Sequence, residues 1–258
     1  VVPIKFIRTV CRTAISARKS FMPMVPDLPA AESAIVEMTN EFRKGNNLAI
    51  VRIDPKLSSA ARRYAEFLAA SRLMSHTADG RRPVDRVKAA GYDACQTSEN
   101  LAMFMDSRGF ETRQLARKMV EGWKNSPGHR KNMLQSSVTD VGIAIAKARG
   151  ELRYYSVQLF GRPESQKYRF EIQNRSNVDT SFTFSGKQQL LKQHYGIRLT
   201  ACQRGTLSIK LPGGDSQAFI PDDGSTYTLK RSRGGKLRIL TGTLERLKLQ
   251  GGSKQPSP

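Results

Sequence analysis

The apolar residues of this chain repeat with a helical period in its first half and with short β-type alternation afterwards, and this change constrains the fold more than any other feature. The clearest helix begins at Asp54-Pro55, an N-cap followed by proline at the first helical position. Apolar residues recur at helical spacing from Leu57 to Leu68, so we expect an amphipathic helix that runs to about Met74 and places His76 just past its end. Other helices are predicted over 31–43, 84–90 and 112–124, with a short one after Ser126-Pro127.

Two alternating segments follow these helices. Residues 138–146 and 152–160 carry apolar side chains at every second position on either side of Gly150, which predicts an antiparallel hairpin. Helices packed on such a sheet favour a layered α+β domain. After Arg162-Pro163 the chain changes to short β-prone runs separated by turn sequences, as expected of a small all-β sandwich or barrel. These runs are 168–173, 181–184, 196–200, 206–211, 226–230 and 237–240.

These patterns divide the chain into four segments. We predict a basic N-terminal extension (1–27), an α+β domain (28–164), a small basic β domain (165–249) and a disordered tail (250–258). In the extension, Lys5, Arg8 and Arg12 interrupt the apolar core that a signal peptide needs. Either a disordered extension or a basic amphipathic helix on an anionic membrane fits it. No apolar run is long enough to predict a transmembrane helix.

The net charge of +21 is concentrated at the two ends of the chain. Residues 165–258 carry sixteen basic and six acidic side chains, and residues 1–25 carry five basic and no acidic ones. Such a field attracts polyanions, so we expect the basic β domain to dock to an anionic polymer or lipid surface. Neither zinc-finger spacing nor an aromatic-rich RNA-reading strand accompanies the charge, so no specific nucleic-acid motif is identified. The oligomeric state is not encoded in any pattern that we recognise.

The three cysteines, Cys11, Cys95 and Cys202, form no CxxC pair, which argues against a structural zinc site. One disulfide is possible. Cys95–Cys202 is the favoured pairing because both residues lie in segments that are expected to fold.

Two of the three histidines have a carboxylate between them in the sequence. His76 follows the long helix, His129 lies in Ser126-Pro127-Gly128-His129, and Glu99 lies between. Two imidazoles and a carboxylate are a ligand set that zinc accepts, although residues this far apart need not meet in the fold. Surface or helix-terminal histidines are the alternative. Ser126 is explained as the N-cap of the short helix, and Trp123 as a core residue.

The chain resembles the CAP superfamily of cysteine-rich secretory proteins, antigen 5 and pathogenesis-related proteins, in its bacterial SCP-like form. Seven matching segments occur in order over about 135 residues, and none matches in 1–27 or 165–258. The segments are Asn40-Glu41-Phe42-Arg43, Asp54-Pro55-Lys56-Leu57, Ser75-His76-Thr77, Glu99-Asn100-Leu101-Ala102, the run from Trp123 to Leu134, Val141-Gly142-Ile143-Ala144, and the run from Tyr155 to Gly161.

The resemblance implies an α-β-α sandwich with a central cleft in which two His and two Glu can hold a divalent cation. His76 and Glu99 match the first pair, and His129 is the candidate for the second His. The second Glu, expected three residues after Trp123, is Ser126 here, so the set is incomplete. The resemblance therefore places His76, Glu99, His129, Asn100 and Ser126 in a ligand-binding cleft, with zinc held weakly, if at all, by His76, Glu99 and His129.

The resemblance also implies a secreted or periplasmic protein of the cell envelope. We expect a binding module that holds a small ligand or a divalent cation in the cleft and docks through its β domain. One alternative is a metal-dependent hydrolase that uses His76, Glu99 and His129, although no carboxylate is left over as its general base. The other is a structural scaffold that recognises a protein partner.

Overall fold

The computed structural model describes residues 22–211 and 214–244. The predictions for residues 1–21 and for the tail at 250–258 lie outside this part of the chain. The first half of the described chain contains five helices and four strands. In chain order they are α1 (Leu28–Lys44), β1 (Arg52–Ile53), α2 (Pro55–Ser71), α3 (Pro83–Ala89), β2 (Ala94–Met105), α4 (Thr112–Asn125), α5 (Pro127–Met133), β3 (Asp140–Lys147) and β4 (Arg153–Pro163).

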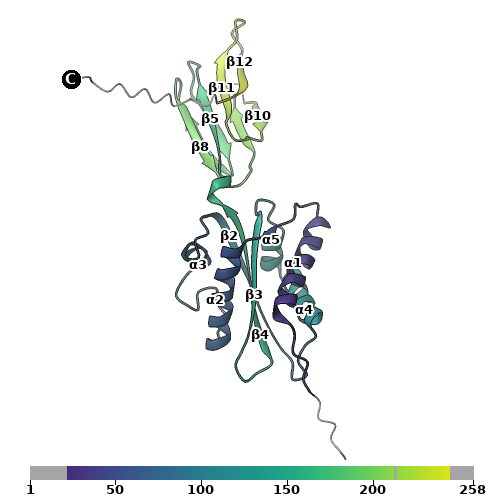
Figure 1. The fold of residues 1–258 in the computed structure, drawn as a ribbon. Coiled ribbons are helices and arrows are strands. Elements are labelled where there is room, and N and C mark those ends of the chain that lie inside the picture. The colour runs from purple at the N-terminus through teal and green to yellow at the C-terminus, as the bar shows by residue number, and fades with distance from the viewer. Residues whose placement is uncertain (1–21, 212–213, 245–258) are drawn as a thin grey trace, which may run out of the picture.

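The four strands form one sheet in the order β1-β3-β4-β2, with helices on both faces. Helices α2 and α3 cover one face, and α1, α4 and α5 cover the other (Figure 1). The predicted hairpin is present as β3 and β4, which pair antiparallel, and β2 pairs antiparallel with β4. The sheet is thus the middle layer of an α-β-α sandwich, as predicted.

Helix α2 begins where it was predicted but ends earlier. The Asp54 side chain accepts hydrogen bonds from the Lys56 and Leu57 amides, which caps the helix at its N-terminus. Arg72 then adopts a left-handed conformation with φ of 59°, and this ends the helix at Ser71 rather than near Met74. The early end leaves the residues around His76 in a loop between α2 and α3.

The second half of the described chain is a β-sandwich joined to the first by the short helix η1 (Glu164–Gln166). Its two four-stranded sheets have the orders β10-β9-β6-β7 and β12-β11-β5-β8. Buried side chains from both sheets form one core, with Phe170 and Tyr227 from one sheet and Phe182 and Ile209 from the other. The strands are β5 (Tyr168–Asn174), β6 (Thr180–Phe184), β7 (Lys187–Leu191), β8 (Gly196–Ala201), β9 (Leu207–Lys210), β10 (Ser216–Phe219), β11 (Ser225–Arg231) and β12 (Leu237–Thr243).

The favoured disulfide is present and joins the two halves. Cys95 on β2 is bonded to Cys202, which directly follows β8. The Arg162 guanidinium adds a second connection, because it donates to the carbonyls of Ser137 and Gln166. The boundary proposed between residues 164 and 165 falls within η1. Among the described residues, no helix is both long and apolar enough to cross a bilayer.

Gly142 on β3 sets how closely α2 lies on the sheet. A Cβ atom at this position would lie 2.2 Å from the Leu57 carbonyl carbon and 2.4 Å from the Ser58 nitrogen. Both atoms belong to the α2 backbone, so they cannot move without displacing the helix.

We therefore expect Gly142→Ala to destabilise the protein by about 3 kcal/mol, as overpacking does in close-packed cores. Gly128→Ala is the control, because a Cβ atom there meets nothing within 4 Å. Urea unfolding followed by circular dichroism measures both free energies. Equal stability of the two variants would contradict the close packing of α2 on β3.

Candidate functional site

The site residues meet over β2, which is an edge strand of the sheet. Glu99 lies on β2, His76 in the loop between α2 and α3, and His129 on α5. Because α2 and α5 belong to opposite layers, the site lies where the two helical layers approach the same sheet edge. The fold thus brings His76 into contact with Glu99, and it packs the helix that carries His129 against the same strand through Asn100.

His76 and Glu99 are in direct contact. The Nδ1 atom of His76 lies 2.7 Å from Oε1 of Glu99. The Glu99 side chain is 1% exposed, whereas that of His76 is 51% exposed. A carboxylate can only accept, so Nδ1 of His76 carries the proton and donates it. The Nε2 atom is then the ring nitrogen that is left for a ligand.

The second oxygen of Glu99 is held by Arg86, a residue of α3 that the sequence analysis did not select. Nη2 of Arg86 donates to Oε2 of Glu99 at 2.6 Å, and the two side chains are 3% and 1% exposed. Both oxygens of this carboxylate therefore have a hydrogen-bond partner, and its charge is paired with a buried guanidinium.

Arg86 also fixes the loop that carries His76. Its Nη1 donates to Oδ1 of Asp79 at 2.9 Å and to the Arg81 carbonyl at 2.7 Å, and its Nη2 donates to the His76 carbonyl at 3.0 Å. The guanidinium carbon lies 3.4 Å from the centre of the Tyr64 ring on α2. In the sequence, this role is indicated only by the position of Arg86, a charged residue on the buried face of the short helix that starts at Pro83.

His129 is half-buried on α5. Burial lowers the pKa of its imidazole below the ordinary value of 6.5, and the nearby charge of His76 lowers it further. His129 is thus kept neutral at neutral pH, which preserves a ring nitrogen that can accept a hydrogen bond.

Asn100 lies on the opposite face of β2 from Glu99 and belongs to a buried polar network. Its Nδ2 donates to Oε1 of Gln158 at 3.0 Å and to the His129 carbonyl at 3.3 Å. Its Oδ1 accepts from Asn132 at 2.9 Å. Asn100 therefore positions α5, and with it His129, against the sheet.

The run from Trp123 to Leu134 covers the outer edge of β2. The indole of Trp123, which is buried as predicted, donates to the Leu101 carbonyl at 2.9 Å, and Asn132 donates to the Glu99 carbonyl at 3.1 Å. These side chains satisfy backbone groups that an edge strand otherwise leaves unpaired. Ser126 is the N-cap residue of α5, as predicted, although its side chain makes no capping hydrogen bond.

The arrangement does not fit a divalent cation bound by His76, Glu99 and His129. A metal would have to compete with Arg86 and His76 for the two oxygens of Glu99. Within the described ranges, no group of three His, Cys, Asp or Glu side chains is placed to hold a metal ion. Arg86 instead supplies the positive charge that Glu99 faces.

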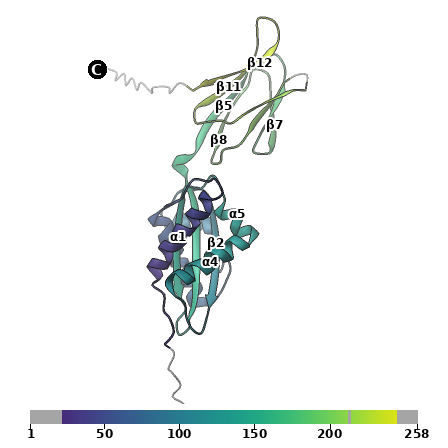
Figure 2. The ribbon, with the colours of Figure 1, turned by 90° about the vertical axis from the view of Figure 1, so that its right-hand side faces the viewer.

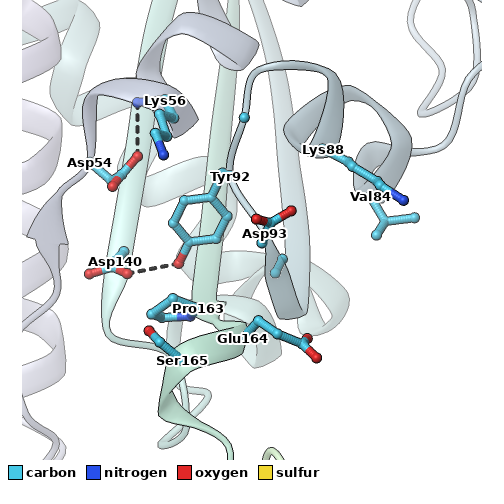
Figure 3. A pocket seen from close by; sticks show the side chains of 12 residues that line it. Asp54, Lys56, Val84, Lys88, Tyr92, Asp93, Asp140, Pro163, Glu164 and Ser165 are labelled. Atoms are coloured by element: carbon cyan, nitrogen blue, oxygen red, sulfur yellow. Dashed lines mark hydrogen bonds between the residues drawn. The ribbon is translucent and has the colours of Figure 1, made fainter. Parts of the chain in front are cut away.

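A separate cavity of about 620 Å³ lies beside η1 and contains none of the predicted site residues (Figure 3). Tyr92 lines it and donates to Oδ2 of Asp140 at 2.7 Å. Burial raises the pKa of the Tyr92 hydroxyl, and Asp140 and Asp54 raise it further, so this tyrosine remains a donor. The lining also contains carboxylates and lysines of the surrounding loops and helices, namely Asp54, Asp93, Asp140, Glu164, Lys56 and Lys88.

The fold defines a CAP-type domain, an α-β-α sandwich in which His76 contacts Glu99 on an edge strand. The model of the cysteine-rich secretory protein family (CAP) matches residues 36–160. An uncharacterised protein of Borreliella burgdorferi is 30% identical over 122 residues, which are 47% of this chain and 72% of that protein. The chain therefore belongs to the CAP family.

Two further proteins are similar to part of this chain. The uncharacterised protein YkwD of Bacillus subtilis is 30% identical over 120 residues, which are 46% of this chain and 44% of that protein. The chain thus spans less than half the length of this relative. A solved structure, an outer surface protein from Borrelia burgdorferi, is 25% identical with a TM-score of 0.46, and covers 52% of this chain and 93% of its own.

The ion pair of Arg86 and Glu99 gives a stability prediction. We expect Arg86→Met to cost about 3–5 kcal/mol, because it leaves the Glu99 carboxylate buried with no cation. The double variant Arg86→Met, Glu99→Met should lose less than the single one, since it removes both charges. Denaturant unfolding measures all three free energies.

Arg81→Met is the matched control. Arg81 pairs with Asp79 in the same loop, but its side chain is 55% exposed, so its loss should cost under about 1 kcal/mol. If Arg86→Met is no more costly than Arg81→Met, Arg86 does not anchor the site.

Proposed function

We propose that this protein is an extracytoplasmic binding module of the cell envelope, whose β-rich half docks to anionic material and presents the CAP site. The observation that carries the choice of binding over hydrolysis is the state of Glu99. Both of its oxygens are bonded, one to His76 and one to Arg86. A metal-dependent hydrolase needs a free carboxylate as general base or metal ligand, and Glu99 is not free.

The site is proposed to bind a small polar ligand. His76 is half exposed and has Nε2 available, and His129 is kept neutral by burial. The accepting nitrogen of His129 and the exposed Nε2 of His76 suit a ligand that exchanges hydrogen bonds with the site. Arg86 and Asn100 contribute by positioning the loop and the helix that carry these imidazoles.

Docking is proposed to rely on the charge of the β-rich half, in which basic residues outnumber acidic ones by ten over 165–258. The location is supported by the Cys95–Cys202 disulfide, which persists in oxidising compartments and is rare in the cytosol. The matching family model is named for secretory proteins, and one similar solved structure is an outer surface protein. Both names fit a location outside the cytoplasm.

The docking is tested with the whole, oxidised chain on beads coated with an anionic polymer and on neutral beads. We expect retention on the anionic beads alone, with affinity falling at least tenfold between about 50 mM and 500 mM salt, because screening shortens the reach of exposed charges. Retention that does not depend on salt, or no retention at low salt, would contradict the proposal.

A further inference from the structure

The β11–β12 hairpin has an unbalanced charge. Residues 224–244 contain five basic side chains and no acidic one. The five are exposed, and none of them forms an ion pair within the described chain. They are Lys230, Arg231, Arg233, Lys236 and Arg238. Among residues 22–211 and 214–244, no acidic side chain neutralises the positive charge of the hairpin.

The register of the hairpin places like charges against each other. Lys230 is directly opposite Arg238, and such pairs destabilise an antiparallel ladder. Arg231 pairs with Leu237 on the other face, next to buried Leu229 and its partner, the partly buried Ile239. Basic side chains thus occupy both faces of the hairpin end, and one pair of them lies directly opposed.

The hairpin has a hydrogen-bonded turn and points away from the CAP sheet. Its turn is closed by bonds from the Ser232 amide to the Lys236 carbonyl and from the Arg231 guanidinium to the Gly235 carbonyl, both 2.8 Å. Because β11 runs parallel to β5, which starts at η1, the turn lies at the far end of the sandwich (Figures 1 and 2). The exposed Arg175 extends the patch, since its amide bonds the Leu229 carbonyl at 2.8 Å.

We infer that this basic hairpin is the docking site for a linear polymer that carries phosphate groups along its backbone. The inference rests on the proposed docking and assigns it a place and a partner. Arginine supplies most of the charge, and its planar fork matches phosphate oxygens in pairs. A flexible chain can contact both faces and the turn of the hairpin at once.

A bilayer fits the hairpin less well than a polymer does. A flat surface that meets the tip of the hairpin contacts the turn, Ser232-Arg233-Gly234-Gly235-Lys236, which contains no apolar or aromatic residue to enter the interface. The charged faces of β11 and β12 would remain unused in that contact. The charges on both faces favour the polymer.

The test measures binding of fluorescent, long-chain inorganic polyphosphate to the whole chain by anisotropy at several salt concentrations. The variant R233Q/K236Q/R238Q removes three hairpin charges that make no side-chain hydrogen bond in the described chain. The control R169Q/K187Q/R204Q removes three exposed charges from the other end of the sandwich. Thermal unfolding checks that both variants fold.

We expect the hairpin variant to bind at least about tenfold more weakly and to lose about 2 from the slope of log affinity against log salt, at about 0.7 per phosphate contact. The control should change affinity by less than about threefold, and its slope should stay the same. The thermal midpoint of the hairpin variant should be unchanged or higher, because a like-charge pair is removed.

Three results would overturn the inference. If both variants bind polyphosphate equally weakly, binding depends on the total charge of the chain and not on the hairpin. A hairpin variant that binds like the unsubstituted chain would disprove the site while leaving the proposed docking intact. Tighter binding to phosphatidylglycerol vesicles than to polyphosphate, lost in the hairpin variant, would assign the site to a membrane. If the unsubstituted chain binds neither probe at low salt, the docking function itself fails.

Discussion

The buried ion pair of Arg86 and Glu99 is the interaction on which the CAP site depends. Burying two charges is costly unless each finds further partners, and here each does: Arg86 also bonds Asp79 and two loop carbonyls, and Glu99 also bonds His76. The pair ties α3, the His76 loop and β2 together. Because Arg86 and His76 each engage one oxygen of Glu99, a metal would have to compete with them for this carboxylate.

Strand β2 connects the Arg86–Glu99 ion pair to both helical layers and to the β-rich half. Glu99 faces the layer of α2 and α3, Asn100 faces the layer of α1 and α5, and the Leu101 carbonyl receives the Trp123 indole. At its start, Cys95 is bonded to the β-rich half. One edge strand therefore positions both histidines and anchors the domain that we propose as the docking element. The basic hairpin lies at the opposite end of that domain, where the CAP region does not cover it.

Helices and the β3–β4 hairpin were predictable because each buries one regular apolar face. Strand β2 was not, since polar Glu99 and Asn100 are buried on opposite faces and break the alternation on which strand prediction relies. For the same reason, sequence spacing alone could not predict that His76 contacts Glu99. The resemblance to the CAP family did place both residues in one cleft. Arg86 was missed because nothing local in α3 shows that its charge meets a carboxylate on β2. The N-cap position of Ser126 was predictable from the proline that follows it.

The most direct test of the account is a calorimetric titration of zinc, at neutral pH and moderate salt, into the whole chain and into the His76→Ala, His129→Ala variant. If Arg86 occupies Glu99 as described, both proteins should show the same weak binding or none, because two imidazoles without a free carboxylate make a poor zinc site. Saturable one-to-one binding at micromolar affinity or tighter, lost in the variant, would contradict it. The Glu99 carboxylate would then be available to a metal, and the result would favour the hydrolase alternative.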